Sequence, residues 1–292
     1  LAKLAKPFSG LFGEKLSGMI NMAPTKLPKA IMPNGTQVFP TEGKIKKRVA
    51  LMPGCAQKVL RPSINEATIR LLTRMGVEVV VADGGCCGAL THHLGKDDAA
   101  REFAKPNIDA WIKEIDQVGL DGIVINAAGC GTEIKDYAFL FKEDPAYREK
   151  AEKISSLTKD ISEVIADLEL PKTSQLSLPS VVYHDACSLM HGQGITQPPR
   201  DQLKAVGFDV VEIPGRHFCC GSAGSYNLLQ STMADQLKDH RLGKLETVLA
   251  DSDAGLLATG NIGCLIQLAS GTDLQVVHTV ELLDWATGGP KP

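Results

Sequence analysis

The chain has 292 residues, of which 43% are hydrophobic and 22% charged, a balance typical of a globular protein. Its formal net charge of −3 gives no electrostatic reason to propose a nucleic acid as partner. The sequence also lacks a run of about 18 apolar residues, the length that a membrane-spanning helix needs.

The first 45 residues are expected to lie ahead of the folded domains. Residues 1–23 place apolar side chains at roughly helical spacing, interrupted by Pro7 and Gly10, which predicts a packing helix. Residues 24–47 are rich in proline and end in a basic cluster, so we interpret them as an extended linker. Residues 1–45 therefore form one predicted N-terminal segment of helix and linker.

Two matching series of elements follow the linker. Each series has an apolar run of strand length, a helical stretch that a glycine ends, and two further apolar runs, which is a β-α-β pattern. The apolar runs cover residues 48–55, 76–81 and 122–125 in the first series and residues 180–187, 207–211 and 255–258 in the second. Between the two series, residues 143–168 are predicted to form a charged, amphipathic helix, and residues 171–175 are the expected boundary.

The 8 cysteines fall in two matching sets of four. The first set is Cys55, Cys86, Cys87 and Cys130, and the second set is Cys187, Cys219, Cys220 and Cys264. Matching cysteines are separated by 132 to 134 residues, which indicates a duplicated domain. We predict an α/β protein with two tandem repeated domains, residues 46–172 and 173–292, related by a pseudo-twofold axis. Each domain is expected to be a small, mostly parallel sheet flanked by helices.

Every cysteine follows the C-terminal end of a predicted strand, the edge at which open parallel sheets bind ligands. The four thiols of each set are therefore expected to converge, with neighbouring sulfur atoms on the order of several ångströms apart. The even cysteine count also fits disulfides. However, the sequence shows no signal-peptide pattern, and secreted disulfide scaffolds are usually shorter, so we favour metal ligation in a reducing compartment.

Four thiolates could hold either a zinc ion or an iron-sulfur cluster. Zinc sites normally use Cys-x2-Cys pairs, whereas the neighbouring residues Cys86 and Cys87 are expected to point apart, which suits a polynuclear cluster better. Gly88 and Gly221 would let the backbone pass close to such a cluster without a Cβ atom in the way. A structural zinc site and a buried apolar Cys-Cys pair are the alternatives.

Several polar residues near the cysteines are candidates for supporting roles. They are His92, His93, His184, Asp185, His217, Ser222, Ser225 and Asn227. A histidine could ligate iron or shuttle protons, but we favour a hydrogen bond to a sulfur or to the backbone, because the cysteines already supply the metal ligands. The aspartate could cap the following helix, and the serines and the asparagine could donate hydrogen bonds that tune a potential.

Two further histidines, His240 and His278, are interpreted as structural. None of the polar candidates is assigned as a catalytic nucleophile. The glycines at 84–85 and 192–194 do not match the spacing of a nucleotide-binding loop.

The cysteine pattern resembles the duplicated cysteine-rich CCG domain of the heterodisulfide reductases. Within that superfamily, six motifs are most similar to the iron-sulfur subunits of glycolate oxidase (glycolate dehydrogenase). They are LMPGC at 51–55, GCCGALTHHLG at 85–95, NAAGCGT at 126–132, YHDAC at 183–187, CCGSAGSYN at 219–227 and HTVELLDW at 278–285. The resemblance extends from about residue 45 to the end of the chain.

The resemblance implies an oxidoreductase subunit that carries electrons and does not itself bind the substrate. The electrons would come from glycolate, or a related 2-hydroxy acid, through an FAD-containing partner subunit and would pass to an acceptor such as a quinone. The eight cysteines would hold iron-sulfur clusters of the [4Fe-4S] type, one per half at most. The implied location is the cytoplasm, with association to the inner face of the membrane as a further expectation.

The sequence departs from these families in two places. The glycolate oxidase subunits carry an N-terminal module with two ferredoxin-type motifs. The sequence that begins at Leu1 does not contain these motifs, and residues 1–45 are expected to be the segment that follows such a module. The reductase domain ends in Cys-x-x-Cys, but Ala127 and Asn261 hold the first of those positions, which leaves four ligands per half and argues against the reductase's non-cubane cluster. An ordinary [4Fe-4S] cluster, an altered cluster and a site in only one half stay open. A lactate-utilisation iron-sulfur protein, a thiol-disulfide oxidoreductase and a zinc-stabilised interaction module stay as alternatives.

The surroundings of the two cysteine sets differ in polarity. The second set has several histidines, serines and an acidic residue nearby, whereas the first set has mostly glycine and alanine. Because hydrogen bonds to cluster sulfurs raise a reduction potential, the second-half cluster is predicted to be the easier to reduce.

Overall fold

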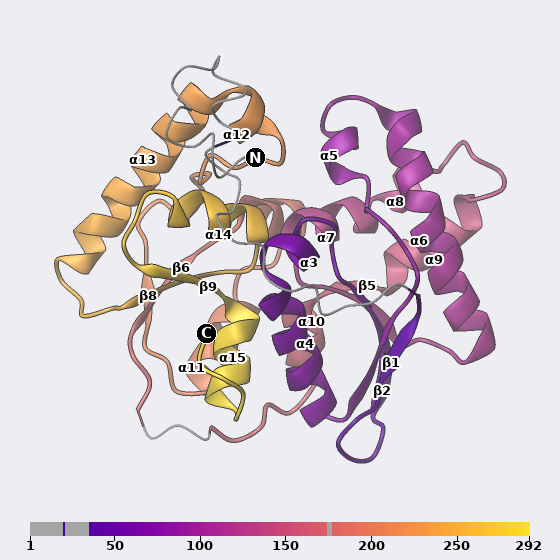
Figure 1. Cartoon of the computed structure of the whole chain (residues 1–292), viewed down its shortest axis with the longest axis horizontal. Helices are drawn as coiled ribbons and strands as arrows, with labels where there is room; N and C mark the ends of the chain where they lie inside the picture. Colours follow the sequence, from indigo (N-terminus) through magenta and orange to yellow (C-terminus); the bar gives the residue numbers. More distant parts are fainter. Residues whose placement is uncertain (1–19, 21–34, 174–176) are drawn as a thin grey trace.

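The computed structural model describes residue 20 and residues 35–173 and 177–292. Two sheets, one in each half of the chain, form its centre (Figure 1). The first sheet has the order β1-β3-β2-β4-β5, with β1 at Gln37–Phe39, β2 at Lys47–Met52, β3 at Val77–Val81, β4 at Gly122–Ile125 and β5 at Thr158–Asp160. The second has the order β7-β6-β8-β9, with β6 at Val181–His184, β7 at Val210–Glu212, β8 at Leu256–Thr259 and β9 at Gln275–His278.

The two sheets repeat one topology. The order β3-β2-β4-β5 corresponds to β7-β6-β8-β9, and all of these neighbours are parallel. Only β1, which pairs with β3, runs antiparallel. The predicted α/β fold with two repeated, mostly parallel sheets is thereby confirmed.

Helices cover both faces of the sheets. Those of the first half are α3 (Gln57–Leu60), α4 (Pro62–Arg74), α5 (Ala89–His92), α6 (Asp97–Gln117), α7 (Ala128–Lys135), α8 (Tyr137–Leu140), α9 (Arg148–Leu157) and α10 (Ile161–Ala166). Those of the second half are the short π-helical turn η2 (Ser188–Gly192), α11 (Pro198–Ala205), α12 (Tyr226–Leu229), α13 (Ser231–Leu249), α14 (Ile262–Ala269) and α15 (Thr279–Ala286).

The halves pack together through the helices α4, α10, α11 and α15, which Figure 1 shows near the centre of the molecule. Helix α4 of the first half lies against α15 of the second, and α10 lies against α11 in the matching way. One hydrophobic core runs through both halves and includes Leu51, Leu71, Val182 and Leu283. Buried Asp284 on α15 accepts hydrogen bonds from two arginines of α4, so an ionic contact adds to this apolar interface.

Three features differ from the sequence predictions. The predicted linker contains β1, which extends the first sheet by a strand. The predicted single helix over 143–168 is broken into α9, β5 and α10, because Thr158–Asp160 pairs with β4 and Asp160 then caps α10. The fourth parallel strand of each sheet, β5 or β9, has no counterpart among the predicted runs.

The helix predicted for residues 1–23 falls almost wholly outside the described residues, as does part of the boundary expected at 171–175. We propose to divide the chain between residues 172 and 173, because α10 is the last element of the first half and β6 the first of the second.

Candidate metal centre

The cysteines of the first set come from three neighbouring strands. Cys55 follows β2, Cys86 and Cys87 follow β3, and Cys130 lies in the first turn of α7, just after β4. Because β3, β2 and β4 are adjacent and parallel, their C-terminal ends meet at one edge of the sheet. The structure therefore brings the four thiols together at that edge.

The four thiols of the first set form a row of contacts. Cys55 donates to the Cys86 sulfur over 3.5 Å, and Cys87 interacts with Cys86 on one side and with Cys130 on the other. The hydrogen bonds from Cys55 and then Cys87 lower the pKa of the Cys86 thiol to about 2. The expectation that Cys86 and Cys87 point apart is wrong for their thiols, which interact, although each reaches a different outer cysteine.

The second set repeats this row. Cys187 interacts with Cys219, which interacts with Cys220, which in turn interacts with Cys264. The pKa of Cys219 is lowered to about 2, chiefly by the hydrogen bond from Cys187. The pKa of Cys264 is also well below its ordinary value, first because of Cys220 and then because of His184, with a smaller contribution from Asn261.

The glycine after each Cys-Cys pair is required by a helix whose backbone lies close behind it, α6 in the first half and α13 in the second. Gly88 and Gly221 have φ values of +91° and +89°, which side chains rarely adopt. A Cβ atom on Gly88 would meet the carbonyl of Ala100 on α6, and one on Gly221 would meet the carbonyl of Ala234 on α13. A close approach between backbones is thus one reason for glycine here, and the role of these glycines beside a cluster stays a prediction.

His184 lies directly behind the second set. It is fully buried, and its Nδ1 accepts a hydrogen bond of 3.0 Å from Nε of Arg241 on α13. Ligand atoms of His184, Cys220 and Cys264 lie within 4.8 Å of one another. His184 is therefore the predicted histidine whose ring the structure places beside a cysteine sulfur.

The acidic candidate Asp185 has a different role from the predicted cap. Both of its carboxylate oxygens accept hydrogen bonds from Arg200, at 2.9 and 2.6 Å, and Arg216 adds a further pair. Burial disfavours the carboxylate, but these arginines outweigh it and lower its pKa. The following π-helical turn has no side-chain cap.

The remaining candidates are spread around the two sets. His92 pairs with buried Glu133, His217 stacks on Phe218, and Asn227 donates to Gln267. Ser225 precedes α12 without capping it through its side chain, and buried Ser222 lies close to the Gly263 backbone. His93 lies near Gly224. The two histidines interpreted as structural are placed accordingly, with His240 against Phe218 and His278 as the cap of α15.

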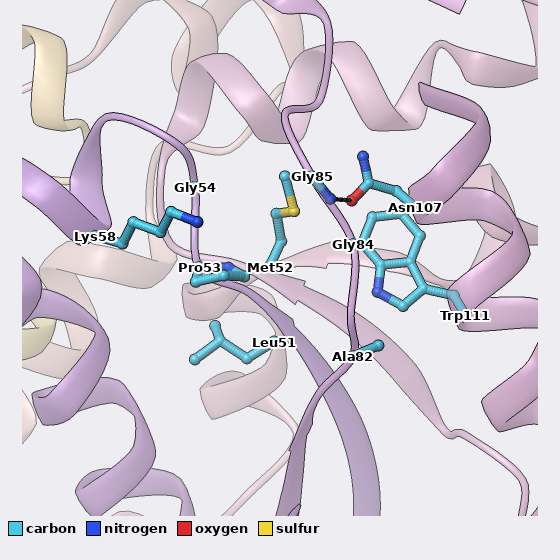
Figure 2. A pocket seen from close by; sticks show the side chains of 10 residues that line it. All are labelled: Leu51, Met52, Pro53, Gly54, Lys58, Ala82, Gly84, Gly85, Asn107 and Trp111. Atoms are coloured by element: carbon cyan, nitrogen blue, oxygen red, sulfur yellow. Dashed lines mark hydrogen bonds between the residues drawn. The ribbon is translucent and has the colours of Figure 1, made fainter. Parts of the chain in front are cut away.

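Three residues that are not among the predicted supporting residues hold the cysteine loops. Asn107 on α6 accepts from the backbone N–H of Gly85 over 2.8 Å (Figure 2). It also donates to the carbonyl of Cys86 over 2.8 Å. Asn261 donates to the Cys264 sulfur over 3.4 Å and accepts from the Gly129 N–H of the other half. Arg241 is the third, because it donates to the carbonyls of Pro214 and Gly215 in the loop that leads to Cys219. Only Asn261 had a signal, since it stands where the reductase pattern has a cysteine.

The two cysteine sets open onto one cavity between the halves. It has a volume of about 450 Å³, and seven of the eight cysteines line it together with residues such as Leu60, Leu90, Leu228, Ile262 and Ile266. Among the described residues, its lining includes no aspartate, glutamate, lysine or arginine. The cavity therefore offers thiols in an apolar enclosure and lacks the carboxylates that acid-base chemistry commonly uses.

The residues present fit a thiolate-bound inorganic group. All eight cysteines are free, each set gathers four sulfur atoms, and the pKa is strongly lowered for Cys86 in the first set and for Cys219 and Cys264 in the second, as a ligand requires. Buried Arg241 supplies positive charge beside the second set without a carboxylate salt bridge among the described residues. An isolated buried charge costs several kcal/mol, so an anion is expected nearby.

None of the described helices combines the length and the apolar character needed to cross a membrane.

Comparison with known proteins identifies two relatives with the name glycolate oxidase iron-sulfur subunit. The Escherichia coli (strain K12) protein is 36% identical over 242 residues, which cover 82% of this chain and 58% of the relative. The Bacillus subtilis (strain 168) protein, named as probable, is 32% identical over an alignment 294 positions long, which covers 93% of this chain and 64% of the relative. The chain thus spans about three fifths of the length of these relatives.

A third relative is covered almost completely. Lactate utilization protein A of Bacillus licheniformis is 26% identical over an alignment 246 positions long, which covers 81% of this chain and 99% of the relative. The family model named CCG, cysteine-rich domain, matches residues 49–135 and 181–269, so it covers all eight cysteines and most of the residues of the strands that precede them. The chain therefore belongs to the CCG family of cysteine-rich domain proteins, with one copy of the domain in each half.

Proposed function

We propose that the chain binds two iron-sulfur clusters, one through each four-cysteine set. The first would be held by Cys55, Cys86, Cys87 and Cys130, and the second by Cys187, Cys219, Cys220 and Cys264. Four thiolates are the ligand set of a cubane [4Fe-4S] cluster, which is the type we propose for both halves. The convergence of four thiols at the same sheet edge in each half is the observation that carries this proposal.

The proposed role is electron transfer within an oxidase of 2-hydroxy acids. Glycolate and lactate, which appear in the names of the relatives, are both 2-hydroxy acids. Their oxidation to 2-oxo acids releases two electrons and two protons, and the clusters would carry the electrons one at a time from an FAD-containing partner to a quinone, which becomes a quinol. Among the described residues, the lining of the apolar cavity has no lysine or arginine to bind the carboxylate of a hydroxy acid, which supports a carrier over a subunit that binds the hydroxy acid. Eight free thiols also favour a reducing compartment such as the cytoplasm.

Anaerobic purification followed by metal and sulfide analysis tests the proposal. We expect a brown protein with iron and acid-labile sulfide, and loss of one set of EPR signals in each of the variants Cys87→Ser and Cys220→Ser. A colourless protein with stoichiometric zinc and neither iron nor sulfide would overturn it in favour of a structural zinc module.

A second candidate, thiol-disulfide chemistry, rests on the single cavity that both cysteine sets line. A disulfide bound there would reach both sets at once. Adding a small disulfide to the reduced protein without any flavoprotein separates the two functions. A cluster signal that shifts on this addition favours the thiol-disulfide enzyme, and an unchanged signal favours the electron carrier.

A further inference from the structure

The two halves differ at the residue that lies behind each cysteine set. His184 is the last residue of β6 and precedes Cys187 by three positions, and Met52 is the last residue of β2 and precedes Cys55 by three positions. Both side chains are buried, but only the histidine has nitrogen atoms. Figure 2 shows Met52 in the first half between the loop of Pro53 and the loop of Gly85, where its thioether offers no hydrogen-bond donor.

The helices behind the cysteine loops differ in the same way. The carbonyls of Ala100 on α6 and Ala234 on α13 both approach the glycine after Cys-Cys, so these two alanines correspond. Seven residues further along each helix come Asn107 and Arg241. Asn107 holds its loop through neutral hydrogen bonds, whereas Arg241 brings a buried guanidinium to the matching place.

The contact with Arg241 decides which ring nitrogen of His184 carries the proton. Arg241 Nε always bears hydrogen, and it donates to His184 Nδ1 over 3.0 Å. Nδ1 must therefore offer its lone pair, and the ring's N–H lies on Nε2. Arg241 is itself held, because its NH1 donates to the carbonyls of Pro214 and Gly215 over 3.1 and 2.9 Å.

The buried Nε2–H group has no hydrogen-bond partner among the described residues, so it is free to donate to a sulfur atom. Within the described residues, His184 Nε2 is a buried atom without a hydrogen-bond partner, and so is one terminal nitrogen of Arg241. The histidine lies with Cys220 and Cys264 in one group of ligand atoms that are within 4.8 Å of one another. Because Nε2 carries a proton, it has no lone pair for a metal, so the ring can donate to a sulfur but cannot ligate iron.

We propose that His184, held in its Nε2–H tautomer by Arg241, donates a hydrogen bond to the sulfur atoms of the second-half centre and gives that centre the higher reduction potential. This inference rests on the proposed iron-sulfur function. Reduction adds negative charge to a thiolate-bound cluster, and a donor backed by a buried cation stabilises that charge. The first half, with Met52 and Asn107 in the matching places, lacks both groups. His184 and Arg241 are thus positioning residues that set the direction of electron flow between the halves.

Exchanging these residues for their first-half counterparts tests the proposal. Midpoint potentials are measured by EPR-monitored titration of the whole chain for wild type, His184→Met and Arg241→Asn, with Met52→Leu as control in the first half. Cys87→Ser and Cys220→Ser assign the signals to the halves. In both second-half variants we expect the preference of the second centre for the reduced state to fall about tenfold, which is ~59 mV for a one-electron couple. The first-half potential should not move, and Met52→Leu should leave the second-half potential unchanged.

A conservative variant and a spectroscopic measurement cover the case in which the apolar replacement does not fold. His184→Gln retains a side-chain N–H, so its second-half potential should lie between those of wild type and His184→Met. In wild-type protein labelled with ¹⁵N-histidine, pulsed EPR of the second-half signal should show one weakly coupled nitrogen, as a hydrogen-bonded ring gives. A strongly coupled, directly bound nitrogen would overturn the assignment of His184 as a donor.

Iron and sulfide content keeps the two levels of the proposal apart. Wild-type protein without iron would overturn the proposed function and this inference with it. Wild-type protein with iron, but with a second-half potential that is unchanged in His184→Met, would overturn the inference alone.

Discussion

Acidification is predicted to weaken the fold through His278, the residue that caps α15 at the interface between the halves. His278 is fully buried, and its Nδ1 accepts from the backbone N–H of Val280 over 3.1 Å, while Glu281 completes the capping box. Burial lowers the pKa of His278 to about 4, although the charge of Glu281 opposes this. The folded protein therefore retains an uncharged ring at a pH at which the unfolded chain has already taken up a proton.

The sign and size of the effect follow from this difference. A histidine with a lowered folded-state pKa contributes its full stability above its ordinary pKa and loses it as the pH falls toward 4. A full shift of this size is worth about 3 kcal/mol, and about 2 kcal/mol of it should be lost by pH 5.

The pH dependence of wild-type stability does not by itself reveal the effect of His278, because Asp160 changes the stability in the opposite direction. Asp160 caps α10 in the first half, and burial raises its pKa to about 6. A raised acid pKa favours the folded state at low pH, and that contribution is lost as the pH rises through the same window. The comparison must therefore be made between wild type and a variant that alters His278 alone.

The assay is urea unfolding of wild type and His278→Asn at pH 7.5 and pH 5. Asparagine can still accept from the N–H of Val280 but does not titrate in this range. Effects common to both proteins, including any change at the cysteines, cancel in the difference. We expect wild type to lose about 2 kcal/mol more than the variant between the two pH values. An equal loss in both proteins would refute the reasoning.

Three further predictions concern the interface, the cysteine loops and the metal. Asp284→Ala removes the buried carboxylate that pairs with Arg70 and Arg74 on α4. It should lower the free energy of unfolding, measured in urea, by about 2 to 3 kcal/mol, which is below the usual value for a buried pair because Arg70 is 38% exposed. A loss under ~1 kcal/mol would show that the ion pair does not hold the halves together. Gly221→Ala should lower the free energy of unfolding by about 2 kcal/mol or more, because the residue has a positive φ and the backbone of α13 lies close to it. The control Gly243→Ala, at an exposed and open position within α13, should be neutral or stabilising by about 0.5–1 kcal/mol. Equal effects of the two variants would contradict the backbone argument. Cys86→Ser should lose about half of the iron and acid-labile sulfide, measured by elemental analysis, and full retention of iron would remove Cys86 from the ligand set.

The repeat itself could be predicted from the sequence because its signal is periodic. The eight cysteines and the apolar runs before them recur at a nearly constant offset. A run of β-branched residues, followed by a helix that ends at a glycine, predicts a parallel β-α-β unit from local sequence alone. The predicted positions of β2, β3, β4 and their counterparts agree with the structure within a few residues. Strand β5 could not be predicted, because Thr158–Asp160 lies in a charged stretch with helical periodicity and pairs only once β4 is in place.

The supporting residues of the site were only partly predictable. His184 and Asp185 are neighbours near a cysteine, so the sequence placed both as candidates, yet one faces the sulfurs and the other faces Arg200 and Arg216. Successive residues at the end of a strand point to opposite sides, and only the packing of α11 and α13 shows which side holds the site. Arg241 had no signal at all, since an arginine in the middle of a polar helix is normally exposed.

The amino-acid sequence by itself thus determined the duplicated α/β units, the positions of their main strands along the chain and the two sets of thiols at the strand ends, because these depend on local periodicity and on a repeated spacing. Only the tertiary structure decided that both sets open onto one cavity, that Gly88 and Gly221 are required by the helices behind them, and that a histidine-arginine pair lies behind one set and methionine and asparagine behind the other. These properties arise where segments far apart in the chain meet, and such contacts are set by packing and burial.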